Sequence, residues 1–222
     1  MDLIILYVLI LIIPLIATLN INSTYGKYKQ IINQKSLTGF DVARAILDAN
    51  DMKDMYIVET PGNLTDHYDP RQKVVRLSTD IYHGNSIASV AVAAHECGHA
   101  IQDKTGYAFM RIRASLVPVV NFVTYSAYIM FFISIVLGYA GLLLVAIASV
   151  IVGLLFQLVT LPVEFDASRR ALVQLEKEGL VDQADKEGSK KVLKAAALTY
   201  VAAVLSSLLN LLRLLSMLNR RR

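Results

Sequence analysis

The stretch that decides the fold is Ala93-Ala94-His95-Glu96-Cys97-Gly98-His99-Ala100, which contains the pattern His-Glu-x-x-His. The preceding residues, 86–94, are uncharged and predict a helix that continues through the motif. Residues four apart lie on one face of a helix, so His95 and His99 direct their imidazoles to one point. The pattern predicts two ligands of a tetrahedral zinc site, with Glu96 beside them as general base.

The alternative is a surface helix that carries two ordinary histidines and a glutamate. The apolar residues before His95 argue against it, because a Glu and two His on a buried helix are costly unless something pairs with them. Cys97 is the single cysteine and projects to a different face from His95, so we expect it to pack rather than to bind metal. A lone cysteine allows no disulfide within the chain, which suits a reducing compartment.

The composition indicates an integral membrane protein. Hydrophobic residues make up 55% of the chain, and the mean hydropathy is +0.49, with the excess concentrated in blocks. The net charge is only +4, and no basic patch is interleaved with aromatic residues. Nucleic acid is therefore not an expected partner, whereas membrane lipid is.

Three apolar blocks predict the membrane segments. Residues 3–22 carry no charge and lack the positive start of a signal peptide, which predicts a retained anchor. Residues 114–163 are also uncharged, and as one helix they would measure about 75 Å against a bilayer core of about 30 Å, so we expect two spans joined near Gly138–Gly141. The last block, 192–218, predicts a helix along or partly in the membrane face, with a fourth span as the alternative.

Residues 24–113 have the composition of a small α+β domain. Thr38 predicts the N-cap of an amphipathic helix with Asp41 in its first turn, and the expected buried stripe is Phe40, Ala43, Ile46 and Leu47. Residues 55–59 predict a strand, and 66–69 lead into 73–78 as a hairpin-like pair.

Positive charge predicts the orientation in the membrane. Lysines and arginines flank the inner ends of the three spans: Lys27, Lys29, Lys35, Arg111, Arg113, Arg169 and Arg170. By the positive-inside rule, the N-terminus lies outside the cell membrane, and the motif domain and the segment after Pro162 lie in the cytoplasm.

A catalytic zinc needs a third protein ligand. The membrane hairpin returns the chain to the motif side at Glu164, which we expect to head a helix, and Glu164 is the favoured ligand. The other reading is a glutamate that complements the helix dipole. Asp166, His67 and His83 are the competing ligands.

The chain resembles the YugP-type membrane zinc metallopeptidases, which are distantly similar to gluzincins. The resemblance covers nearly the whole chain and rests on the anchor, the membrane hairpin and three motifs: residues 66–71, 95–102 and 161–171. It implies Zn²⁺ as cofactor, a Glu ligand on a second helix, matching Glu164, and an edge role for strand 73–78 toward an extended peptide. Many gluzincins orient the first histidine with an Asp at the position occupied here by Ser168.

The predicted protein is an α-helical membrane protein with a small α+β, zincin-like catalytic domain and three transmembrane helices. Its expected parts are an anchor (1–23), a metallopeptidase domain (24–113), a transmembrane hairpin (114–163), and a third-ligand helix with a C-terminal apolar helix (164–222).

The predicted activity is hydrolysis of a peptide or protein substrate. Zinc held by His95, His99 and Glu164 would lower the pKa of its bound water towards about 7, and Glu96 would accept the proton. Tyr200, His67 and Arg169 are the candidates for stabilising the carbonyl oxygen.

Two rival functions are intramembrane proteolysis and a non-catalytic scaffold or protease adaptor. The uncharged run 86–94 is too short to span a bilayer. The sequence also offers no fourth Cys or His ligand at a spacing that suits a structural metal site.

Overall fold

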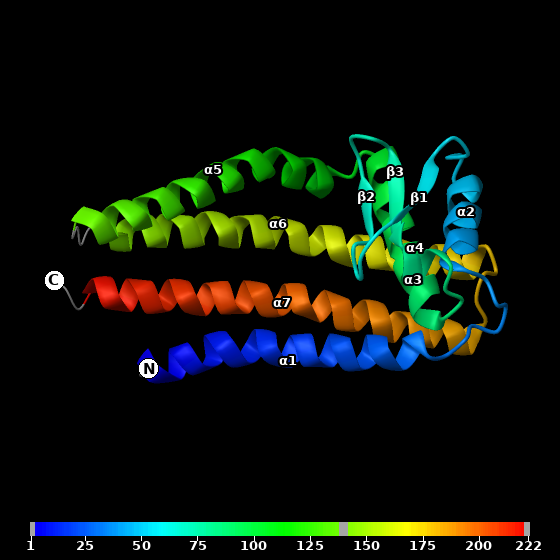
Figure 1. The fold of residues 1–222 in the computed structure, drawn as a ribbon, viewed down its shortest axis with the longest axis horizontal. Helices are drawn as coiled ribbons and strands as arrows, with labels where there is room; N and C mark the ends of the chain where they lie inside the picture. The colour runs from blue at the N-terminus through cyan, green and yellow to red at the C-terminus, as the bar shows by residue number, and fades with distance from the viewer. Residues whose placement is uncertain (1–2, 138–141, 220–222) are drawn as a thin grey trace. The chain divides into compact units, whose positions relative to one another are not determined.

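The computed structural model describes residues 3–137 and 142–219, which form mostly helices and one small sheet (Figure 1). The helices are α1 (Leu3–Lys29), α2 (Gly39–Ala49), α3 (Thr79–Tyr82), α4 (Ile87–Lys104), α5 (Ala108–Leu137), α6 (Leu142–Lys177) and α7 (Gln183–Asn219). The strands are β1 (Tyr56–Thr60), β2 (His67–Asp69) and β3 (Val74–Ser78).

The chain divides into two compact units. The first unit contains Met1–Thr18, Ala108–Pro162 and Leu198–Arg222. The second contains Leu19–Tyr107 and Val163–Ala197, and it holds the sheet, the short helices and the His-Glu-x-x-His motif.

Four helices are long and apolar enough to cross a membrane: α1, α5, α6 and α7. None of the residues in the most apolar window of α5 is buried by protein, which suits contact with lipid. The C-terminal helix α7 meets the same criteria and begins at Gln183, earlier than the expected start at residue 192. The expected turn at 138–141 lies outside the described residues.

Pro162 does not end α6, which runs without interruption from Leu142 to Lys177. The expectation that Glu164 heads a helix was therefore wrong. Proline is tolerated within apolar membrane helices, because neighbouring groups satisfy the carbonyl that it leaves free. Glu164 sits in the middle of a long helix, so a charge complementing the dipole at a helix start does not explain it.

The sheet has the order β1-β3-β2. Strand β3 pairs in parallel with β1 and antiparallel with β2, so both of its edges are occupied. The expected edge role of strand 73–78 is therefore wrong, and β1 and β2 form the edges. The hairpin-like pairing of 66–69 with 73–78 is confirmed by the β2–β3 register, in which Tyr68 faces Val75.

Helix α2 begins as expected, with a capping box between Thr38 and Asp41. Such caps stabilise a helix by about 1 kcal/mol. Val42, Ala43, Ile46 and Leu47 are fully buried. Phe40 was wrongly placed in this stripe: it is half-buried and its ring lies 5.0 Å from that of Tyr82, whereas Val42 occupies the core.

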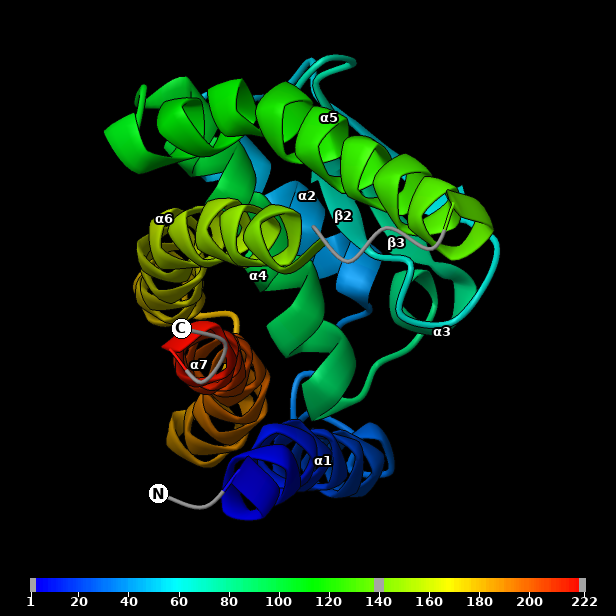
Figure 2. The same ribbon diagram turned by 90° about the vertical axis from the view of Figure 1, so that its left-hand side faces the viewer.

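Helix α4 is the centre of the second unit. The Ser86 side chain caps its first turn, and the helix ends at Lys104. It packs against α2 and the sheet (Figure 1; Figure 2). Near its C-terminal end, the Tyr68 hydroxyl donates to Asp103 at 2.8 Å, which ties the helix to β2. These contacts fix the helix that carries the motif.

Candidate metal centre

Three ligand-type side chains from two helices meet in the second unit. The Nε2 atoms of His95 and His99 on α4 lie 3.3 and 3.7 Å from Glu164 Oε2 on α6. One ligand atom from each residue lies within 4.8 Å of the others. Two imidazole nitrogens and one carboxylate oxygen are a donor set that suits zinc.

A glycine permits the two helices to approach so closely. A Cβ at Gly98 would lie 2.4 Å from the backbone oxygen of Ala167, closer than any side chain tolerates. Gly98 therefore lets α4 rest directly on the backbone of α6. The neighbouring Cys97 is buried and directs its Sγ toward the Ala43 oxygen on α2, which confirms its packing role. One face of α4 thus packs against α6 through Gly98, and another packs against α2 through Cys97.

The orientation of His99 follows from a chain of hydrogen bonds through Gln102. The Gln102 amide nitrogen donates to the Val163 oxygen at 2.8 Å and to Asp166 Oδ2 at 3.0 Å. The Gln102 Oε1 must then face His99 Nδ1, 3.0 Å away, and accept its proton. This assignment leaves the lone pair on His99 Nε2, the atom that points at Glu164.

The orientation of His95 depends on a weaker contact. Ser168 Oγ on α6 lies 3.2 Å from His95 Nδ1. A serine hydroxyl is a neutral partner and raises the basicity of the ring less than a carboxylate does. The two histidines therefore have similar positions and unequal partners.

Asp166 does not belong to the group of ligand-type side chains. Its carboxylate accepts hydrogen bonds from Gln102, Arg169 and Arg170. It acts on His99 through Gln102, one side chain removed. Two positions apart on a helix, Glu164 and Asp166 point in different directions, and the structure directs only Glu164 at the imidazoles.

Glu96 is buried at the same place, with 7% of its surface exposed. Among the described residues, none forms a hydrogen bond or ion pair with its carboxylate. A mostly buried carboxylate without a protein partner is unusual, because burial disfavours an unpaired charge. No described side chain engages the carboxylate oxygens of Glu96.

Burial and the carboxylate charges of the site shift the pKa values of His99 and Cys97. Burial disfavours the charged imidazole of His99, but the Glu164 carboxylate beside it outweighs burial and raises the pKa of His99. Burial raises the pKa of the Cys97 thiol well above its ordinary value, with a further contribution from the Glu96 charge. The thiol next to the motif is therefore a poor nucleophile.

The other histidines lie elsewhere. His67 is exposed, and its Nδ1 contacts the Thr65 oxygen at 2.7 Å. His83 is exposed and lies 3.2 Å from Glu59. Neither belongs to the group of potential ligands found in the described part of the chain.

Gln102 is the functional residue that sequence reasoning missed. It is completely buried and lies three residues after His99, so the two side chains share a helix face. A polar amide one turn beyond a predicted metal ligand was the available signal.

Comparison with known proteins supports these observations. A family model described as "Putative neutral zinc metallopeptidase" matches residues 3–219. The "Putative membrane protease YugP" of Bacillus subtilis (strain 168) is 43% identical over 197 residues, which cover 89% of this chain and 88% of that protein. No solved structure matches the chain.

Proposed function

The chain belongs to the family described as "Putative neutral zinc metallopeptidase", and from this premise we propose that it is a membrane-anchored zinc endopeptidase. The observation that carries the proposal is the convergence of His95 Nε2, His99 Nε2 and a Glu164 oxygen within 4.8 Å. We propose these three residues as the zinc ligands on a small zincin-like domain.

The two histidines and Glu164 fit zinc as donor types, and hydrogen bonds hold both histidines in place. The Nδ1 atoms of both histidines face hydrogen-bond partners, Gln102 and Ser168, while both Nε2 atoms face Glu164. This is the arrangement in which a histidine binds metal through one nitrogen and is oriented through the other. Bound zinc would polarise the substrate carbonyl and make water acidic enough to be deprotonated near neutral pH.

Glu96 is the proposed general base. It follows His95 directly, is 7% exposed, and has no hydrogen bond or ion pair with a described residue. It accepts a proton from the attacking water and donates that proton to the leaving amine as the peptide bond breaks. The candidate oxyanion donors are Arg169, His67 and Tyr200; the Arg169 guanidinium donates to Asp166, and His67 Nδ1 contacts the Thr65 oxygen.

The alternative function is a non-catalytic scaffold or protease adaptor with a structural metal site. Structural zinc is held by four protein ligands. Within residues 3–137 and 142–219, the group around Glu164 contains three potential ligands. A three-ligand set leaves a position open and favours the enzyme.

The test is metal content together with proteolysis of a casein-type substrate. The purified protein should contain about one zinc per chain and cleave the substrate, and a chelator should abolish cleavage until zinc is restored. The variant His95→Ala/His99→Ala should lose both metal and activity. Metal retained in that variant would remove His95 and His99 from the site, and cleavage that resists chelation would refute a zinc peptidase.

We further propose that the N-terminus is outside and that the motif domain and Glu164 are cytoplasmic, as the distribution of Lys and Arg favours. A probe cysteine at the exposed Lys35, in a Cys97→Ser background, should react with an impermeant thiol reagent only after the cells are permeabilised. Labelling in intact cells would reverse the proposed topology.

A further inference from the structure

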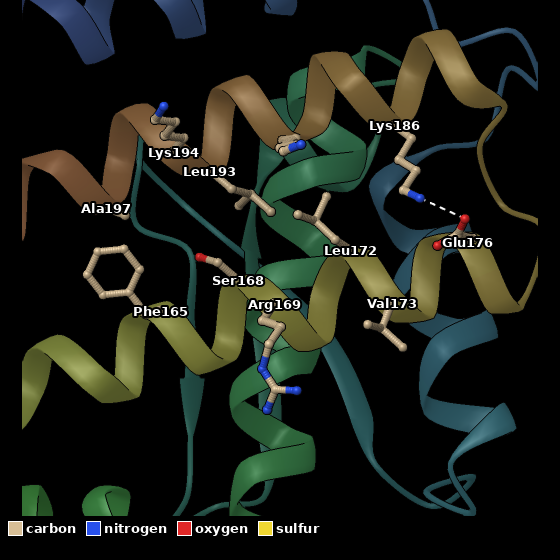
Figure 3. A pocket seen from close by; sticks show the side chains of 11 residues that line it. Phe165, Ser168, Arg169, Leu172, Val173, Glu176, Lys186, Leu193, Lys194 and Ala197 are labelled. Carbon is tan, nitrogen blue, oxygen red and sulfur yellow. Dashed lines mark ion pairs between the residues drawn. The ribbon is translucent and has the colours of Figure 1, made fainter.

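A pocket of about 530 Å³ lies between α6 and α7 within the second unit. Figure 3 shows Leu172 on α6 and Leu193 on α7 directed into the space between the helices, with Phe165 and Ala197 at one end. The interior of the pocket is therefore mainly apolar. Phe165 is 47% exposed, so this apolar surface is accessible from the surface of the protein.

The charged residues of the pocket are mostly cations. Arg169, Lys186, Lys190 and Lys194 line it, against the single acid Glu176. The pair Lys186–Glu176, at 2.7 Å, closes the end opposite Phe165 (Figure 3).

Two of the lysines are available for a ligand. Lys190 and Lys194 are exposed and four residues apart, so they share one face of α7. Lys190 has only a 3.8 Å contact with Glu187, and Lys194 has no ion pair or hydrogen bond within the described chain. The pocket thus combines an apolar interior with uncompensated positive charge.

The pocket also lies where both helices change in character. Residues 142–163 of α6 carry no charge, and charged residues begin at Glu164, next to Phe165. Residues 195–212 of α7 carry no charge, and Lys194 directly precedes them. In a helix whose apolar run lies in hydrocarbon, the adjoining charged turn lies at the level of the lipid head groups.

From these observations we propose that the α6–α7 pocket binds an anionic phospholipid. The phosphate pairs with Lys190 and Lys194, and the first methylenes of an acyl chain pack on Phe165, Leu193 and Ala197. Basic pockets between helices at the membrane surface recognise anionic head groups in this way. The proposal does not depend on peptidase activity.

The test uses full-length protein in nanodiscs of equimolar phosphatidylglycerol and phosphatidylcholine. After transfer to detergent, native mass spectrometry counts the lipids that remain bound. Wild-type protein should retain more phosphatidylglycerol than phosphatidylcholine. Each lysine should contribute roughly fivefold to this ratio, so Lys190→Gln/Lys194→Gln should lower it roughly 25-fold.

The matched control is Lys177→Gln/Lys191→Gln, which removes the same charge from exposed positions of α6 and α7 that do not line the pocket. It should retain phosphatidylglycerol as wild type does. Equal losses in both variants would indicate general surface attraction and overturn the proposal, as would wild-type retention in the pocket variant.

Two further outcomes would assign the pocket another occupant. Full displacement of the lipid by soluble glycerol 1-phosphate would indicate a phosphate site in place of a lipid site. Ser168 lines the pocket and also contacts His95, so a peptide substrate is the second alternative. Unchanged lipid retention with a raised KM for peptide in the pocket variant would place substrate there and refute lipid binding.

Discussion

Glu96 on α4 and Glu164 on α6 are both buried carboxylates of one site, but their surroundings differ. Glu164 lies between two imidazole nitrogens, at 3.3 and 3.7 Å. Glu96 has no hydrogen bond or ion pair with any described residue, although only 7% of its surface is exposed. The environment therefore separates a carboxylate suited to bind metal from one suited to carry a proton.

The hydrogen-bond partners of the two histidines also differ in their surroundings. The α4 side of the site supplies Gln102, which is fully buried and has three hydrogen bonds, and it orients His99. The α6 side supplies Ser168, a partly exposed hydroxyl with a 3.2 Å contact to His95. We expect Gln102 to contribute more to zinc affinity than Ser168 does.

The largest effect should come from Glu164. Glu164→Gln replaces a charged ligand by a neutral amide oxygen, so zinc affinity should fall by more than about 100-fold. Zinc affinity is measured by competition with a chelator of known strength. Asp166→Asn serves as the matched control two residues away.

Asp166→Asn should lower zinc affinity by at most about 10–100-fold, because Asp166 reaches the site only through Gln102. Unchanged binding in Glu164→Gln, with loss in Asp166→Asn, would transfer the ligand role to Asp166.

Substitution of Gln102 or Ser168, the hydrogen-bond partners of the two histidines, should have a smaller effect on zinc affinity. Gln102→Leu leaves His99 Nδ1 and the Val163 oxygen without their partner, and we expect a loss of about 10- to 100-fold in zinc affinity. Ser168→Ala removes one neutral contact and should cost less. The reverse order, measured in the same competition assay, would show that Ser168 is the principal support.

The smallest effect should come from Cys97. Its thiol is buried, and burial raises its pKa, so a thiol reagent should modify the folded protein very slowly and leave zinc affinity unchanged. The rate is measured by mass spectrometry against protein in denaturant. Rapid modification of the folded protein would place Cys97 on an accessible face of α4.

Local patterns in the sequence predicted the motif helix and the start of α2 well. The spacing of His95 and His99 and the capping box at Thr38 each depend on neighbours within about one turn. Such features need no knowledge of the distant chain. The family resemblance is likewise confirmed over nearly the whole length.

Most of the errors concern features that depend on the environment of a segment in the folded protein. Pro162 looked like the end of a helix, but a proline within an apolar helix is compatible with a continuous α6. The resemblance to the family implied an edge role for strand 73–78, but β1 pairs with β3 in parallel and makes it the central strand. Gln102 was missed because its partners on α6 are more than sixty residues away.

The most direct test of the central claim is the variant Glu96→Gln, with zinc content and peptidase rate measured on the same preparation. The ligands remain, so the variant should retain about one zinc per chain. The base is lost, so the rate should fall by about 100- to 10,000-fold. A variant that keeps its zinc and cleaves peptide at nearly the wild-type rate would contradict the role assigned to Glu96.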